Sequence, residues 1–183
     1  ENDPVKRDHE KYYFLIFGEP SETGTWAWRF EGHHLSINFT IVDGETTFPT
    51  PSFLGANPGL VESGAHKGLR ALAEAEDLGF ALANALSPKQ LKAATIPGKT
   101  PRDILTKEQP IAKRPDASQG IALTELNAEQ QKAFWNLVKE YVGRLNETQA
   151  KADLSRFQAV PASELRFAWS GGTKPGQAHY YRI

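Results

Sequence analysis

Two adjacent histidines, His33 and His34, are the side chains best suited to chemistry. An imidazole can bind zinc, copper or iron, and it can transfer protons near neutral pH. The chain has no cysteine, so a metal must be held by histidine, carboxylate or other oxygen ligands. A strand sends neighbouring side chains to opposite faces, so we expect that the pair cannot chelate one ion by itself. His34 is predicted to be a metal ligand or an acid–base group and His33 an alternative ligand; a hydrogen-bonded structural histidine is the other interpretation of each.

A third imidazole, His179, lies in the last segment of the chain, AHYYRI. If that segment is a strand that pairs near His33 or His34, the sheet brings distant histidines together. The three side chains would then form a site for a divalent metal ion, zinc, copper or iron, at the end of the sheet. Otherwise His179 is a surface histidine at the start of a strand, and no cofactor is expected.

The segment TWAWRFE alternates aromatic and polar side chains, which predicts a half-buried strand. Arg29 and Glu31 share one face of this strand. Arg29 could bind a carboxylate or a phosphate through its planar fork of donors, although a solvated arginine is the commoner case. Together with His34, Arg29 and Glu31 are the catalytic candidates, with the role of orienting a substrate or relaying a proton.

Trp26, Trp28 and Ser36 are the candidate ligand-binding residues. The two tryptophans point to one face, which is either a stacking surface for sugar rings or peptide, or a surface buried under helices. Ser36 belongs to a polar row with His34, which is either solvent surface or the floor of a cleft. The ligands expected here are a small molecule or a glycan.

The composition excludes several classes of partner. The 183 residues include 21 basic and 22 acidic side chains, so the chain lacks the broad positive field of a nucleic-acid binder. No stretch approaches the roughly 20 apolar residues of a membrane span. Motifs for a nucleophile elbow, a zinc-protease helix and a glycine-rich phosphate loop are also missing. A partner must therefore be recognised by local chemistry.

Short apolar runs and two-residue alternation predict strands over residues 12–17, 25–31, 33–42, 45–48, 165–170 and 178–183. The first of these, YYFLIF, is expected to be buried on both faces. Gly32 is predicted to make the turn before the third strand, and Asp43-Gly44 to close the next hairpin. Residues 49–64 are rich in proline and glycine and are expected to form a long irregular loop.

Apolar residues at helical spacing predict helices over residues 69–86, 88–94, 127–145 and 147–158, the third opening with an Asn127–Gln130 capping box. Residues 95–122 are expected to be a surface excursion with one helical turn around Ile104, and residues 1–11 a mobile lead-in. The order of strands, helices and strands predicts a single α+β domain over residues 12–183. Its antiparallel sheet is expected to carry helices on one face.

Three segments, FGEPSETGTWAWRFEGHHLSINFTIVDG, TPSFLGANPG and GQAHYYRI, resemble the domain-of-unknown-function family numbered 3500. The resemblance covers residues 12–183 and implies an uncharacterised protein that is secreted or periplasmic. It also implies a longer family unit, with further histidines after HYYRI. The positions that match are Trp26, Trp28, Arg29, Glu31, His33, His34, Ser36 and His179. The family implies no established reaction.

Two hypotheses of different classes follow. The first is a secreted α+β protein with a histidine-centred, metal-binding site at the end of the sheet; if it is an enzyme, hydrolysis or oxidation at the ion is the natural class. The second is a non-catalytic extracellular module that binds glycans or self-associates through its tryptophan strands and an exposed sheet edge. The residues alone do not decide between them.

Overall fold

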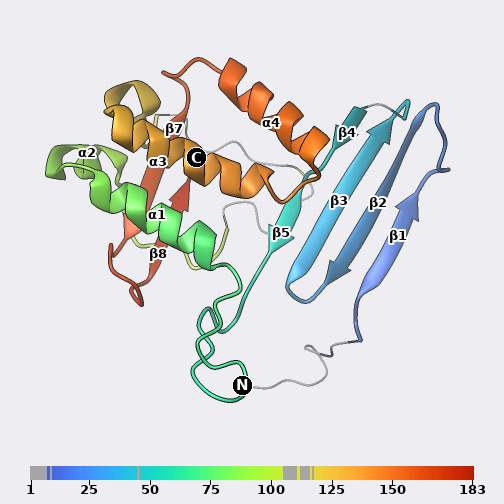
Figure 1. Ribbon diagram of the computed structural model, residues 1–183, viewed down its shortest axis with the longest axis horizontal. Helices are drawn as coiled ribbons and strands as arrows, with labels where there is room; N and C mark the ends of the chain where they lie inside the picture. Colours follow the sequence, from blue (N-terminus) through green and yellow to red (C-terminus); the bar gives the residue numbers. More distant parts are fainter. Residues whose placement is uncertain (1–7, 9, 45, 105–110, 112–115, 117) are drawn as a thin grey trace. The chain divides into compact units, whose positions relative to one another are not determined.

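The computed structural model describes residues 8, 10–44, 46–104, 111, 116 and 118–183. The chain forms two compact units, residues 1–72 and residues 73–183, and each is described by itself. Antiparallel strands and separate helices confirm the predicted α+β class (Figure 1). The single domain over residues 12–183 stays a prediction. Most of the predicted lead-in, with His9, lies outside the described residues, as do residues 105–110, 112–115 and 117 of the predicted surface excursion.

The first unit contains an antiparallel sheet in which the strand order is β1-β2-β3-β4, with β5 also paired to β3. The strands are β1 (Tyr13–Phe17), β2 (Thr25–Gly32), β3 (Leu35–Val42), β4 (Thr46–Phe48) and β5 (Ser52–Leu54). Their positions confirm the strands predicted from alternation. The strand β5 is a correction, because it lies inside the segment 49–64 that was expected to be irregular. Its three residues are too few for a recognisable alternation.

Two hairpin turns set the register of this sheet. Gly32 pairs with Leu35, so the two histidines between them form the whole connection from β2 to β3. The predicted strand start at His33, with Gly32 as the turn, is therefore wrong by two residues. The predicted Asp43-Gly44 turn is confirmed: both residues have positive φ, 52° and 66°, and the Asp43 carboxylate accepts a hydrogen bond from the Gly24 N–H at 2.7 Å.

Strand β1 was expected to be buried on both faces, and this prediction is wrong. Its side chains are largely exposed, with Tyr13 at 56% and Phe14 at 60%. The strand stands at one end of the strand order and pairs only with β2 among the described strands. A continuous apolar run is also compatible with an edge strand, because it does not reveal how many neighbours a strand has.

The second unit combines helices with an antiparallel sheet in the order β6-β7-β8. Its elements are α1 (Ala73–Ala85), α2 (Pro88–Ala94), β6 (Ile121–Ala122), a 3-10 turn (Leu123–Glu125), α3 (Ala128–Val142), α4 (Glu147–Ala159), β7 (Arg166–Gly171) and β8 (His179–Arg182). The predicted helices and closing strands are confirmed to within a few residues. The Asn127–Gln130 capping box is present, and Ser87 and Asn146 cap the neighbouring helices in the same way, by accepting a backbone N–H.

The core of this unit lies between the helices and one face of β7. Phe167 and Trp169 alternate onto that face and are buried against Leu82 of α1 and Phe134 of α3. Helices packed on one face of an antiparallel sheet were expected, and this unit shows them (Figure 1). Burial of these large rings contributes strongly to the hydrophobic stabilisation of the unit.

A buried amide joins three of the helices. Gln130 is 4% exposed, and its Nε2 donates to the Ala85 carbonyl at 2.7 Å, at the end of α1. Its Oε1 accepts hydrogen bonds from the Asn127 N–H and from the Gln90 Nε2, both at 2.9 Å. The second of these bonds connects Gln130 to the first turn of α2. Gln130 itself is buried and these hydrogen bonds are partly shielded from water, so losing the amide leaves several polar groups without their partners.

Gln130→Met is expected to lower the free energy of unfolding by about 1–3 kcal/mol, the cost of leaving partly buried polar groups without hydrogen-bond partners. The same change at an exposed position of α4, Gln158→Met, is the matched control and should stay within about 0.5 kcal/mol of the wild type. Urea unfolding followed by circular dichroism measures both. Equal stability of the two variants would contradict the role given to Gln130.

Candidate functional site

The two histidines of the β2–β3 connection lie side by side. The centroids of the His33 and His34 rings are 4.3 Å apart and the rings are tilted by 51°. The expectation that their side chains point to opposite faces is wrong, because residues in a two-residue loop lie outside the strand ladder and lose its alternation. The Gly55 N–H donates to the His34 carbonyl at 2.8 Å, which attaches the chain after β5 to this loop. The loop therefore holds two imidazoles next to each other on a backbone that is anchored by Gly55.

A polar network occupies one face of the sheet next to this loop. Arg29 and Asn38 pair across β2 and β3, and the Arg29 Nε donates to the Asn38 Oδ1 at 2.6 Å. The Asn38 Nδ2 donates to the Ser36 Oγ at 3.2 Å, and the Arg29 Nη1 lies 3.4 Å from the Glu31 Oε2. The structure thus brings together three of the predicted site residues, Arg29, Glu31 and Ser36.

A hollow of about 260 Å³ lies beside Arg29 on this face. The guanidinium stands 5.5 Å from the centroid of the Phe17 ring, and the lining includes Asn38, Thr40 and Thr50. The two threonines were not predicted as site residues. The two-residue period of β3 places Thr40 on the face of Ser36, but no local pattern indicates that residue 50 reaches the same hollow.

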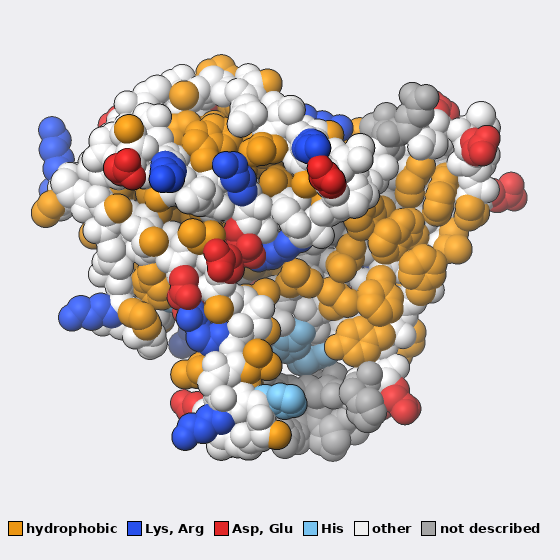
Figure 2. All heavy atoms as spheres, in the orientation of Figure 1, with side chains coloured by type: hydrophobic (Ala, Val, Ile, Leu, Met, Phe, Trp, Pro, Cys, Tyr) orange, Lys and Arg blue, Asp and Glu red, His pale blue; other side chains and the backbone are white. Residues whose placement is uncertain are grey.

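The opposite face of the sheet is aromatic and carries Trp26 and Trp28. The rings of Phe14, Trp28 and Phe39 stack in a row across three strands, with neighbouring centroids 5.5 Å and 4.5 Å apart. Trp28 pairs directly with Phe39, whereas Phe14 pairs with Phe30 and lies diagonal to Trp28. Hydrophobic side chains gather over β1 to β3 in the space-filling view (Figure 2). The predicted ligand-binding residues are therefore divided: the tryptophans lie on this face, and Ser36 lies on the other.

His179 belongs to the second unit, where it packs in an aromatic environment. Its ring stacks on Trp169 at 5.6 Å between centroids, and its Nε2 lies 3.8 Å from a carboxylate oxygen of Glu76. Strand β8 pairs with β7, so the pairing expected to bring His179 beside the other histidines is not among the described ones. Within the described ranges, no three histidine, aspartate or glutamate side chains are grouped so that they could hold a metal ion.

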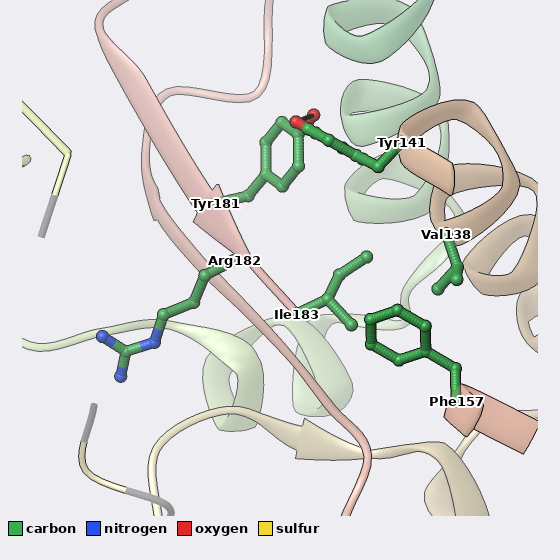
Figure 3. A pocket seen from close by; sticks show the side chains of 6 residues that line it. All are labelled: Val138, Tyr141, Phe157, Tyr181, Arg182 and Ile183. Atoms are coloured by element: carbon green, nitrogen blue, oxygen red, sulfur yellow. Dashed lines mark hydrogen bonds between the residues drawn. The ribbon is translucent and has the colours of Figure 1, made fainter. Parts of the chain in front are cut away.

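A second hollow, of about 360 Å³, lies in the second unit (Figure 3). It is lined by Val138, Tyr141, Phe157, Tyr181, Arg182 and Ile183. The hydroxyls of Tyr141 and Tyr181 are 2.6 Å apart, and the Tyr181 hydroxyl donates to the Ala75 carbonyl at 2.8 Å. The Tyr141 hydroxyl must then donate to Tyr181. No pattern in the sequence indicates this site, because its lining comes from three separate segments.

Arg182 contributes its stem to this hollow but directs its charge away from it. Figure 3 shows the guanidinium pointing away from the apolar side chains, and its Nη2 donates to Gln119 at 2.6 Å. Burial raises the pKa of Tyr181 well above its ordinary value near 10. The hollow is consequently apolar, with a neutral pair of phenols at one side.

The chain belongs to the family described as "Protein of unknown function (DUF3500)", which matches residues 3–183. This confirms the resemblance carried by the three sequence segments. A search of curated proteins found no match, and neither did a search of solved structures. In the described part of the chain, no helix has both the length and the apolar character needed to cross a membrane. The family description assigns no activity, so function must be argued from the sites themselves.

The raised pKa of Tyr181 predicts a loss of stability in alkali. Above about pH 10 the unfolded chain ionises this phenol while the folded chain keeps it protonated, so the unfolded state binds fewer protons and stability falls as pH rises. Tyr181→Phe should make this fall shallower, by at most about 1.4 kcal/mol per pH unit, the value for one proton. Urea unfolding measured at several alkaline pH values tests this.

The control is Tyr180→Phe, which removes a phenol one residue away on the same strand. A Tyr181→Phe variant whose stability depends on pH as steeply as that of the wild type would show that the phenol is not shielded in the folded protein.

Proposed function

We propose that this chain, whose family description assigns no activity, binds a divalent metal ion at the His33–His34 loop. The single observation that carries the proposal is the 4.3 Å separation of the two ring centroids. The proposal keeps the predicted histidine-centred site but limits it to the two imidazoles that the β2–β3 hairpin holds together. A location outside the cytoplasm rests on the family resemblance alone and remains part of the proposal.

The donor set of the loop fits a transition metal. Imidazole nitrogens suit zinc, copper and iron, and the chain has no thiolate that could compete for the ion. His33 is exposed and His34 is half-buried, so an ion can reach both rings. The backbone hydrogen bond from Gly55 to His34 and the Gly32–Leu35 pair limit the loss of conformational freedom on binding.

Two protein ligands leave coordination positions open for water or substrate. An ion in such a site could supply Lewis-acid activation of water, which fits the hydrolysis expected of an enzyme. Glu31 lies at the end of β2 next to the loop, and its Oε2 is 3.4 Å from the Nη1 of Arg29, which stands nearer the middle of the strand. As charged side chains on one face, they could orient a substrate, which is the catalytic role predicted for them.

His33→Ala and His34→Ala are each expected to weaken zinc binding to the full chain at least about tenfold. Loss of an outer-shell partner already costs a metal site about 10–100-fold, and a direct ligand should cost no less. Isothermal titration calorimetry with zinc and with copper measures the effect. His66→Ala, which removes a histidine from another loop of the same unit, is the matched control and should bind like the wild type.

His179→Ala separates this site from the three-histidine site predicted from the sequence. If the loop is sufficient, this variant binds zinc as the wild type does. Zinc binding that survives the double change of His33 and His34 to alanine, or no binding by the wild type, would contradict the proposal.

A second candidate function, self-association, is favoured by the aromatic face of the first unit. Phe14 and Ile16 of β1 are 60% and 52% exposed on this face, and such apolar surfaces usually mark an interaction site. Strand register places no charged side chain of the described residues on it. A sugar would require polar groups beside the rings, whereas a second copy of the chain offers the same uncharged surface. Of the two non-catalytic roles predicted from the sequence, glycan binding and self-association, we therefore propose self-association.

Phe14→Ser is expected to shift the chain toward the monomer, because it removes an exposed ring from the β1 end of the aromatic row. Sedimentation velocity over a range of protein concentrations measures the shift. Phe17→Ser on the opposite face of the same strand is the matched control and should associate like the wild type. A wild-type chain that is monomeric at all concentrations would exclude this function.

A further inference from the structure

We infer that the hollow beside Arg29 binds a small carboxylate that has an aromatic or aliphatic body. The inference rests on the polar face of β2 and β3 and on none of the histidines, so it is independent of the proposed metal site. The hollow lies toward Thr40 and Thr50, whereas the histidine loop follows the other end of β2.

The guanidinium of Arg29 is held in a fixed orientation before any ligand binds. Its Nε donates to the Asn38 Oδ1 at 2.6 Å. Asn38 is fixed in turn, because its Nδ2 donates to the Pro51 carbonyl at 2.8 Å and to the Ser36 Oγ at 3.2 Å. Because the Arg29 guanidinium is already oriented, it loses little conformational freedom when a ligand binds, and this favours affinity for the ligand.

Most of the donors of Arg29 remain available. An arginine side chain carries five N–H groups. In the described part of the chain, Arg29 uses its Nε for Asn38 and its Nη1 for Glu31. The contact with Glu31 is long, at 3.4 Å, whereas charge-assisted hydrogen bonds usually measure about 2.7–2.9 Å. A ligand carboxylate could therefore take two parallel N–H groups without breaking a strong ion pair.

The walls of the hollow define the rest of the ligand. The Phe17 ring lies 5.5 Å from the guanidinium, and Ala27 adds a further apolar surface. Thr40 and Thr50 contribute hydroxyl groups to the lining. An acid whose ring or short chain packs on Phe17 while its carboxylate meets Arg29 fits this arrangement.

Size and charge favour a small monoanion over a phosphate. The volume of about 260 Å³ lies just below the range of about 300–1,000 Å³ that is usual for small-molecule sites. Among the described residues of the lining, Arg29 is the only cationic side chain, and Glu31 lies close to it. A phosphate group carries between one and two negative charges at neutral pH and would be repelled more strongly by Glu31 than a carboxylate.

The test uses benzoate as the probe, with benzamide as its neutral isostere and inorganic phosphate as the competing anion. Binding to the full chain is followed by chemical-shift changes of the β2 and β3 amides. We expect benzoate to bind at least about tenfold more tightly than benzamide, because only the charged form makes charge-assisted bonds with the fork. Arg29→Gln should remove this preference, and Arg29→Lys should lose at least about tenfold in affinity because the fork is lost.

Two further variants make the outcome specific. Thr40→Val keeps the branched shape and the strand while it removes a hydroxyl from the lining, so it should weaken benzoate binding even if changes at Arg29 disturb the sheet. Arg156→Gln, an arginine of α4 in the second unit, controls for the loss of one positive charge and should bind as the wild type does.

Three results would overturn the inference: equal binding of benzoate and benzamide, unchanged benzoate binding by both Arg29→Gln and Thr40→Val, or binding of phosphate alone. Absence of any binding by the wild type would do so as well. Benzoate binding that persists when His33 and His34 are both alanine shows that this site stands even where the metal proposal fails.

Discussion

The register in which β2 pairs with β3 is the constraint on which both sites of the first unit depend. Because Gly32 faces Leu35, the connection contains two residues, and both are histidines. The same register sets Arg29 opposite Asn38 on one face and Trp28 opposite Phe39 on the other. A slip of one residue would lengthen or shorten the loop and carry every side chain of β3 to the other face. The imidazole pair, the polar hollow and the aromatic row would then all be lost together.

Interactions on both faces of the sheet support this register. On the aromatic face, Trp28 and Phe39 stack with centroids 4.5 Å apart. On the polar face, Arg29 donates to Asn38 at 2.6 Å. At the far end of the hairpin, the Asp43 carboxylate accepts the Gly24 N–H, which fixes the pair Thr25–Val42 next to it. Contacts of different chemical kinds thus favour the same pairing, which is the consistency expected of a sequence that specifies one structure.

Much of the fold and several site residues could be predicted from local pattern, whereas the geometry of the sites could not. The capping box of α3 and the Asp43-Gly44 turn are local signals, and both are confirmed. The histidine loop was misplaced because the apolar alternation of β3 extends back to His33 without a break, and adjacent histidines are not a recognised turn signal. The hollow beside Arg29 depends on cross-strand register and on the approach of Thr50 and Pro51, which no period in the sequence reveals. The strand that contains His179 pairs with β7, and no local pattern in the sequence indicates this partner.

The register itself can be measured most directly by cross-linking, since the chain has no cysteine of its own. Ala27 and Thr40 are paired and share a face, so the combination of Ala27→Cys and Thr40→Cys should oxidise to an intramolecular disulfide. Ala27→Cys with Ile41→Cys, one position out of register, should keep both thiols free, because residue 41 points to the other face. Thiol counting by intact mass after mild oxidation distinguishes the two. The predicted result is a disulfide in the Ala27→Cys, Thr40→Cys variant alone. Preferential disulfide formation in the Ala27→Cys, Ile41→Cys variant would contradict the strand pairing on which both sites depend.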